Sequence, residues 1–442
     1  MSSSSRNRTG AGRKSRELPR KRTRLPDRAV AAILQVARYG AAAAALAAAG
    51  TVDAANWDYN PRVELAATYN DNFRLAENSQ PKIVAAGPVL DATFGMRSLT
   101  QTNELSLAPR IRVSIYPDDH DDQSTDGYFD LKGEHKTQKL DLALLGSYAN
   151  ESVIYSDLLP ANFNGTPLGE IVGTGSNRVT VSNRRQLERL EPSLVYDFTQ
   201  REHFLTNLEY EHASFSKNDV FQQIGYKNLF GTVGLGLDFT QRSTVTFMVN
   251  GARFEPEVGG DTTSYGMTSQ WSWRRTQVQQ FYVRAGLARS QADVPGGATT
   301  SNTNFVGGAG VSWTYQITKY VIDFLQGVSP SSSGAVVNHT EARGQLIRSF
   351  SPRLSGTLAV RAIRLRGAAV LVQGSDYAAA TAGFQYQITR NYRLAGEYDY
   401  TWLRFQGEPN ANSNAVFVSI IYQPLSRFEP LPDLNGLPPP RR

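Results

Sequence analysis

The chain has 442 residues, of which 40% are hydrophobic and 10% aromatic, with no cysteine and a formal net charge of +6. The lack of cysteine excludes disulfides, thiolate nucleophiles and cysteine-ligated metal sites. The charge does not indicate nucleic-acid binding, because residues 1–55 carry a net charge of +8 and the remainder a net charge of −2.

Residues 1–55 have the layout of a long secretory signal peptide. Arg6–Arg28 is strongly basic, Ala29–Gly50 is small and apolar, and Val52–Ala54 offers a cleavage pattern of small residues. We therefore expect export through the Sec route and removal of residues 1–55. The alternative is a disordered basic arm before an Ala-rich helix.

Alternation typical of β-strands begins directly after this leader. A first strand is expected over Pro61–Tyr69 and another over Leu105–Ile115, where apolar and polar residues alternate and Pro109 predicts a bulge. Tight turns are predicted at 99–103 and 136–139. Longer loops are predicted at 71–86, 117–125 and 150–185, and the last of these either folds inward as a constriction or lies on the surface.

The second half of the chain carries an internal repeat of about 38 residues. Phe198–Arg201 (Phe-Thr-Gln-Arg) returns as Phe239–Arg242, with looser copies further along, the last at Ile388–Arg390. Each interval holds two long strands and one longer polar connection. Long strands joined alternately by tight turns and longer loops are typical of transmembrane β-barrels.

The predicted fold is therefore all-β: a transmembrane up-and-down antiparallel barrel of about 18 strands (16–20) over residues 56–424. A β-propeller has a similar repeat length, but it needs four short strands per repeat rather than two long ones. Residues 425–442 are proline-rich and predict an extended tail. Both termini are expected on the short-turn side, which is periplasmic in such barrels.

In a membrane barrel the apolar parity of each strand faces lipid and the polar parity faces the lumen. Tyr392–Trp402 shows the split over 11 residues. Aromatic residues near strand ends are candidates for the girdles at the membrane interfaces: Trp271, Trp273, Trp313, Tyr315, Tyr392 and Trp402. Ordinary sheet packing is the alternative explanation for each of them.

Charged residues on the polar parity are the candidate selectivity residues of the lumen: Arg110, Arg112, Arg284, Arg361, Arg393, Glu397 and Asp399. Arginines gathered at a constriction favour anionic solutes. The competing interpretation is that these arginines pair with lumen acids and simply fill a polar interior.

The first strand runs into Tyr69-Asn70-Asp71-Asn72. This element, in which Tyr69, Asp71 and Asn72 match a Tyr-x-Asp-Asn pattern, resembles the opening hairpin of the beta-barrel porin 2 family of proteobacteria. The resemblance implies an outer-membrane protein, often linked with surface-polysaccharide export. It also implies an aromatic assembly signal at the end of the last strand, for which Tyr422 or Phe428 is the candidate.

We predict an outer-membrane channel for passive diffusion, or a conduit linked to polysaccharide export. A closed structural barrel that binds polysaccharide, lipopolysaccharide or a periplasmic partner is the first alternative, and an outer-membrane hydrolase the second. No catalytic residue, metal site or cofactor is predicted. Expected partners are outer-membrane lipid, lipopolysaccharide and the barrel-assembly machinery, together with polysaccharide-export components if that role holds.

Overall fold

The structure is a computed structural model that describes residues 56–117, 123–154, 183–216, 223–294, 298–368 and 373–424. The predicted leader (1–55), the predicted tail (425–442) and most of the loop predicted over 150–185 lie outside these ranges. Within them, no helix is long and apolar enough to cross a membrane.

The described chain forms one sheet of 18 antiparallel strands. Their bounds are β1 Asn56–Asn70, β2 Ala85–Leu99, β3 Asn103–Ser114, β4 Ser124–Lys136, β5 Leu140–Ser152, β6 Arg184–Asp197, β7 Glu202–Phe215, β8 Tyr226–Thr240, β9 Ser243–Pro256, β10 Thr262–Thr276, β11 Gln279–Val294, β12 Ala298–Tyr315, β13 Thr318–Ser331, β14 Ala335–Ser349, β15 Leu354–Gly367, β16 Ser375–Gln387, β17 Tyr392–Phe405 and β18 Asn410–Tyr422.

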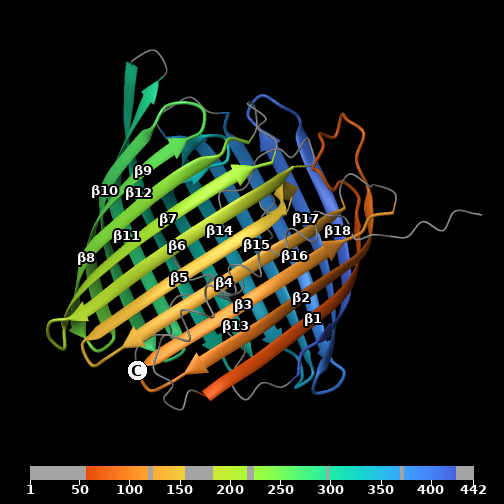
Figure 1. Ribbon diagram of the computed structural model, residues 1–442, viewed down its shortest axis with the longest axis horizontal. Helices are drawn as coiled ribbons and strands as arrows, with labels where there is room; N and C mark the ends of the chain where they lie inside the picture. The colour runs from red at the N-terminus through yellow and green to blue at the C-terminus, as the bar shows by residue number, and fades with distance from the viewer. Residues whose placement is uncertain are drawn as a thin grey trace, which may run out of the picture.

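Each strand pairs with its sequence neighbours, and β18 pairs with β1 in a register from Val63↔Tyr422 to Asn70↔Ala415. The sheet therefore closes into an up-and-down barrel, which confirms the predicted fold and strand number. Figure 1 shows the tight turns at the lower rim and the longer connections at the upper rim. β1 begins and β18 ends at the tight-turn rim.

Alternation of side chains gives the barrel two chemically different faces. The outward parity is apolar and exposed, for example Leu65 (57% exposed) on β1 and Met267 (68% exposed) on β10. The inward parity is polar, as in the run Arg393, Glu397 and Asp399 on β17. Closure leaves no strand at a free edge of the sheet. An outer surface this apolar is suited to hydrocarbon rather than to water.

The repeated Thr of the sequence caps the tight turns. Thr199 Oγ1 accepts hydrogen bonds from the backbone N–H groups of Arg201 (3.2 Å) and Glu202 (3.1 Å), and Thr389 Oγ1 accepts from Tyr392 N (3.2 Å). A short hydroxyl side chain that accepts from the backbone two or three residues on stabilises such turns. The sequence repeat therefore marks the tight turns, which all lie at one rim of the barrel.

Pro109 does not produce the predicted bulge. β3 pairs with β4 without a shift, including Pro109↔Phe129. On its other side, β3 keeps one register with β2, and only the pairs between Thr93↔Arg110 and Met96↔Leu107 are missing. Proline lacks an N–H group, so it removes a ladder hydrogen bond on one side and leaves the strand path unchanged.

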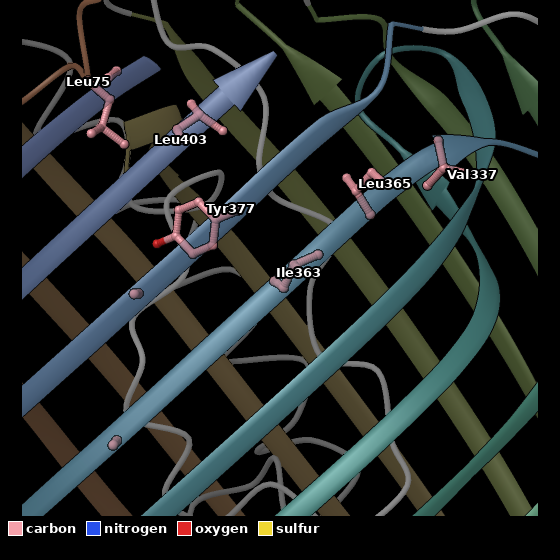
Figure 2. Close-up of a cluster of buried hydrophobic side chains, with 9 residues drawn as sticks. Leu75, Val337, Ile363, Leu365, Tyr377 and Leu403 are labelled. Atoms are coloured by element: carbon pink, nitrogen blue, oxygen red, sulfur yellow. The ribbon is translucent and has the colours of Figure 1, made fainter. Parts of the chain in front are cut away.

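Apolar side chains gather inside the barrel at the loop rim. We call this set the apolar collar; it comprises Phe73, Leu75, Val153, Ile154, Phe215, Tyr226, Phe254, Val336, Leu365, Tyr377 and Leu403. Leu75 comes from the β1–β2 loop with a positive φ of 49° and is buried. Figure 2 shows it above Leu403 and Tyr377. The collar therefore joins a loop to the inner wall.

Candidate functional site

The inward faces of the strands enclose a central cavity of about 1680 Å³. Its lining runs from Arg393 and Gln423, beside the tight turns, to Leu75 and Tyr226 in the apolar collar, so the cavity follows most of the barrel's length. Among the described residues the lining includes seven arginines and nine carboxylates: Arg62, Arg110, Arg112, Arg185, Arg189, Arg284, Arg393, Glu64, Asp91, Asp130, Glu151, Glu191, Glu209, Glu211, Glu397 and Asp399.

Several of the ion pairs that line the cavity lie near one another on one side of the barrel. We call them the charged wall; it consists of Asp91, Arg110, Glu151, Arg185, Arg189, Glu191 and Glu209 on β2, β3 and β5–β7. Arg110 lies 2.5 Å from Asp91 and its side chain is 39% exposed. Arg189 lies 3.0 Å from Glu209 and is 43% exposed. These guanidinium groups are paired and still accessible to a solute.

A second group of inward charges is fully buried. This buried block consists of Asp323, His339, Glu341, Arg343 and Arg361, on β13–β15, and none of these side chains is more than 3% exposed. Arg343 Nη2 lies 2.6 Å from Asp323, and Arg361 Nε lies 2.8 Å from Glu341. His339 Nε2 lies 3.0 Å from the other oxygen of Glu341. Two guanidinium groups thus balance two carboxylates, as burial requires.

Strand register places three residues of the block in one row that runs across five strands. Tyr282, Gly310, Asp323, Arg343 and Arg361 are successive cross-strand partners from β11 to β15. The Tyr282 hydroxyl donates a hydrogen bond to Asp323, which lies two strands away. That contact requires Gly310 on the strand between them, because a Cβ there would lie 2.5 Å from the Tyr282 ring and 2.7 Å from the Asp323 carboxylate.

The structure places most of the predicted lumen residues on the cavity and one in the buried block. Arg110, Arg112, Arg284, Arg393, Glu397 and Asp399 line the cavity, while Arg361 belongs to the block. Arg284 donates from Nε and Nη2 to the neutral Gln270 Oε1 (2.9 and 2.7 Å), and Arg393 donates to Gln423. Thr381 and Asp399 share a 2.5 Å hydrogen bond. The acid paired with Arg110 is Asp91, not one of the acids singled out beside the arginines in the sequence.

Several inward-facing residues that were not predicted from the sequence could have been identified from alternation. Glu341, Arg343 and Gln345 alternate along β14 on the polar parity, as do Arg185 and Arg189 on β6. Alternation therefore identifies them as inward-facing. It does not say which of them lie on the cavity, because that depends on neighbouring strands.

The Tyr69–Asn72 motif spans the end of β1 and adds contacts to β18 where the barrel closes. Asn72 is fully buried; its Nδ2 donates to Ala76 O (2.8 Å) and Asn412 O (2.9 Å). The Asp71 carboxylate accepts from the backbone N and the side-chain Nδ2 of Asn414, both at 2.7 Å. The contact between β1 and β18 thus extends beyond the last strand pair. Tyr69 faces outward beside Val416 and Val418 on β18.

The predicted girdle residues occupy both rims of the outer face. At the tight-turn rim Trp271 stacks on Trp273 (ring centroids 6.0 Å apart), and Tyr392 contacts Tyr422 (5.1 Å). Trp313 and Tyr315 lie at the same rim, 6.2 Å apart. At the loop rim Trp402 lies against the Arg404 guanidinium, 5.6 Å from ring centroid to Cζ. Their role at a membrane interface stays a prediction.

The chain matches no protein-family model, and no curated protein matches it. The resemblance to the beta-barrel porin 2 family therefore stays a prediction. Solved structures with a similar fold include OccK2 (OpdF) of Pseudomonas aeruginosa in complex with glucuronate, with 11% identity, a TM-score of 0.46, and 84% of this chain and 99% of that chain covered. OccAB2 of Acinetobacter baumannii gives 10% identity, a TM-score of 0.45, and 83% and 98% coverage. The FrpB iron transporter of Neisseria meningitidis has 7% identity and a TM-score of 0.44, with 82% of this chain and 81% of that chain covered.

Proposed function

We propose that this protein is a channel of the bacterial outer membrane through which small polar solutes diffuse without bond chemistry. The cavity carries the proposal: a polar space of about 1680 Å³ follows the inside of a closed barrel whose outer face is apolar. Barrels of 16–18 strands are wide enough to hold an aqueous channel. The lumen needs no cofactor for this role.

We place the tight-turn rim in the periplasm and the loop rim at the cell surface, as in bacterial outer-membrane barrels. Residues 56 and 422 both lie at the tight-turn rim. A processed N-terminus and a proline-rich tail would then both lie on the periplasmic side. Because the chain lacks cysteine, single-cysteine labelling of intact cells tests the orientation: Ser79→Cys should react with an impermeant maleimide and Gln277→Cys should not.

The channel should prefer cations weakly. Nine carboxylates outnumber seven arginines in the described lining, and several of those arginines are neutralised at short range, as Arg110 is by Asp91. A lumen with excess carboxylates attracts cations and raises their local concentration. The arginine set therefore does not support selection of anions by net charge.

Two proposals, the open channel and its weak cation preference, can be tested together. The measurements are the single-channel conductance of the purified chain in a planar bilayer and its reversal potential in a KCl gradient. Stable ohmic steps with a reversal potential of the cation-selective sign are expected. A protein that inserts, resists unfolding in detergent and carries no current contradicts the open channel. A soluble β-rich protein that never inserts contradicts the membrane assignment itself.

A closed barrel is the second candidate function, and the apolar collar favours it. Leu75 and Phe73 reach from the β1–β2 loop into apolar clusters at the loop rim. Apolar constrictions can exclude water and ions even where some space remains. Replacement of residues 73–82 by a short Gly-Ser linker should then convert a silent barrel into a conducting one. If the native chain already conducts, the collar is not a closed gate.

The link to polysaccharide export rests on the resemblance of the Tyr69–Asn72 element alone. We propose it as a role for the same channel, with an export complex as its partner. The test is the amount of surface and released polysaccharide from a deletion strain against the complemented strain. Equal amounts would remove this role and leave the diffusion channel standing.

A further inference from the structure

Three arginines share one carboxylate on the outer face of the barrel at the loop rim. Arg364 and Arg366 on β15 and Arg404 on β17 each lie 3.0 Å from the carboxylate of Asp376 on β16. Arg364, Asp376 and Arg404 are successive cross-strand partners. We call these four residues the arginine cluster. Since one acid faces three guanidinium groups, the cluster carries a net charge of +2.

The charges around Arg253 on the same rim are arranged differently. Arg253 on β9 also faces outward near the loop rim, but it lies 2.8 Å from Glu255 and 3.1 Å from Asp261, so two acids face one arginine. Glu408, in the turn between β17 and β18, accepts a hydrogen bond from the neutral Gln373 Nε2 (3.0 Å) and keeps its negative charge. Across β18, Lys82 donates to Asn412 Oδ1 (3.2 Å) and adds a further cation beside the cluster.

The cluster begins where the apolar outer face ends. Below it on β15, Leu358 and Val360 are exposed apolar residues, and Trp402 lies directly against Arg404 on β17. An aromatic ring followed by cationic side chains along a strand is the sequence of chemistries that crosses from hydrocarbon to headgroup. The anions found at that depth in a bilayer are lipid phosphates.

We propose that Arg364, Arg366 and Arg404 bind the phosphate group of a membrane lipid headgroup. Guanidinium groups present paired N–H donors that match phosphate oxygens, and Asp376 holds three of them in one place while neutralising only one charge. The proposal rests on the orientation given above, under which the loop rim meets the outer leaflet. The ligand there is a phosphorylated glycolipid of the lipopolysaccharide type.

Binding of lipopolysaccharide to the purified full chain in detergent tests the site, with dephosphorylated lipopolysaccharide and phosphatidylglycerol as the other probes. The triple variant R364Q/R366Q/R404Q should bind lipopolysaccharide at least about tenfold more weakly, since it removes three positive charges that attract lipid phosphate. The matched control R253Q should bind as the native chain does. The single variant R404Q should weaken binding less than the triple variant, and it keeps the test valid if the triple variant does not fold.

The possible outcomes separate the lipid site from its alternatives. Native-like affinity in the triple variant, or equal losses in R253Q, overturns the proposal. Displacement of lipopolysaccharide by millimolar inorganic phosphate alone would show a general anion site and overturn the lipid assignment. Loss of phosphatidylglycerol binding in the triple variant, combined with labelling of Gln277→Cys rather than Ser79→Cys on intact cells, would support the phosphate site and overturn the orientation instead.

Discussion

Two groups of inward-facing charges use the same chemistry and differ in their contact with the cavity. The charged wall on β2, β3 and β5–β7 holds Arg–carboxylate pairs such as Arg110–Asp91 on the lining of the cavity. The buried block on β13–β15 holds Arg343–Asp323 and Arg361–Glu341 with almost no exposed side-chain surface. Polarity of the inner face therefore does not by itself mean access to a solute.

Because the two groups differ in their exposure to water, we expect them to have different roles. Removal of one member of a buried pair leaves an uncompensated charge in a medium of low dielectric constant, so the buried block determines stability and barrel shape. A pair that faces water is screened and contributes little to stability, but its charges act on ions in the cavity. Selectivity should thus follow the charges that line the cavity, and folding should follow the block.

The largest effect is expected for Arg343→Met. The substitution leaves Asp323 without its 2.6 Å partner inside the block, and the free energy of unfolding should fall by about 3–5 kcal/mol. Arg189→Met in the charged wall is the matched control and should cost no more than about 1 kcal/mol. Urea-induced unfolding of the barrel in detergent micelles or vesicles measures both. Equal losses in the two variants would contradict the distinction between wall and block.

Gly310→Ala should produce the next largest effect. Its Cβ would lie 2.5 Å from the Tyr282 ring, so the ring must move and its hydrogen bond to Asp323 is lost, at a cost of about 1–3 kcal/mol. Gly133→Ala on β4 is the control, because nothing lies within 4 Å of a Cβ at that position. The same unfolding measurement applies. A Gly310→Ala barrel as stable as the Gly133→Ala barrel would show that the row does not need the glycine.

Much of the fold could be predicted because alternation is a local property. The pleat sends successive side chains to opposite faces, so the strands, their number and their inward residues follow from the sequence alone. The lengths of the turns and loops could also be predicted, because they are the segments left between the alternating strands. The expected bulge at Pro109 was wrong because a proline can lose one ladder hydrogen bond without a change of register.

Whether an inward charge lines the cavity or is buried could not be predicted. That outcome depends on cross-strand partners, which the sequence of one strand does not specify. Arg284 and Arg361 look alike in the sequence, yet one lines the cavity beside Gln270 and the other is buried against Glu341. Asn72 shows the same limit. Its position in a motif was visible, but its bond to Asn412 joins residues 340 positions apart and emerges only when the barrel closes.

Double-mutant cycles compare directly the strength of an ion pair in the charged wall with that of an ion pair in the buried block. The coupling free energy between Arg110 and Asp91, from Arg110→Gln, Asp91→Asn and the double variant, should be at most about 1 kcal/mol, because Arg110 is 39% exposed. The corresponding cycle for Arg343 and Asp323 should give a clearly larger value. If the exposed pair couples as strongly as the buried one, water does not screen the wall and the cavity is dry there.

The smallest free-energy change and the most direct functional one should come from Arg284→Glu. Arg284 lines the cavity and donates two hydrogen bonds to the neutral Gln270, so reversal of its charge adds two negative units to the lining. The reversal potential in a KCl gradient should shift toward stronger cation preference. Arg289→Glu, on the outward parity of the same strand, should leave it unchanged. An unchanged potential in Arg284→Glu as well would place the selectivity-determining charges on the wall across the cavity, in which case Arg189→Glu should move it.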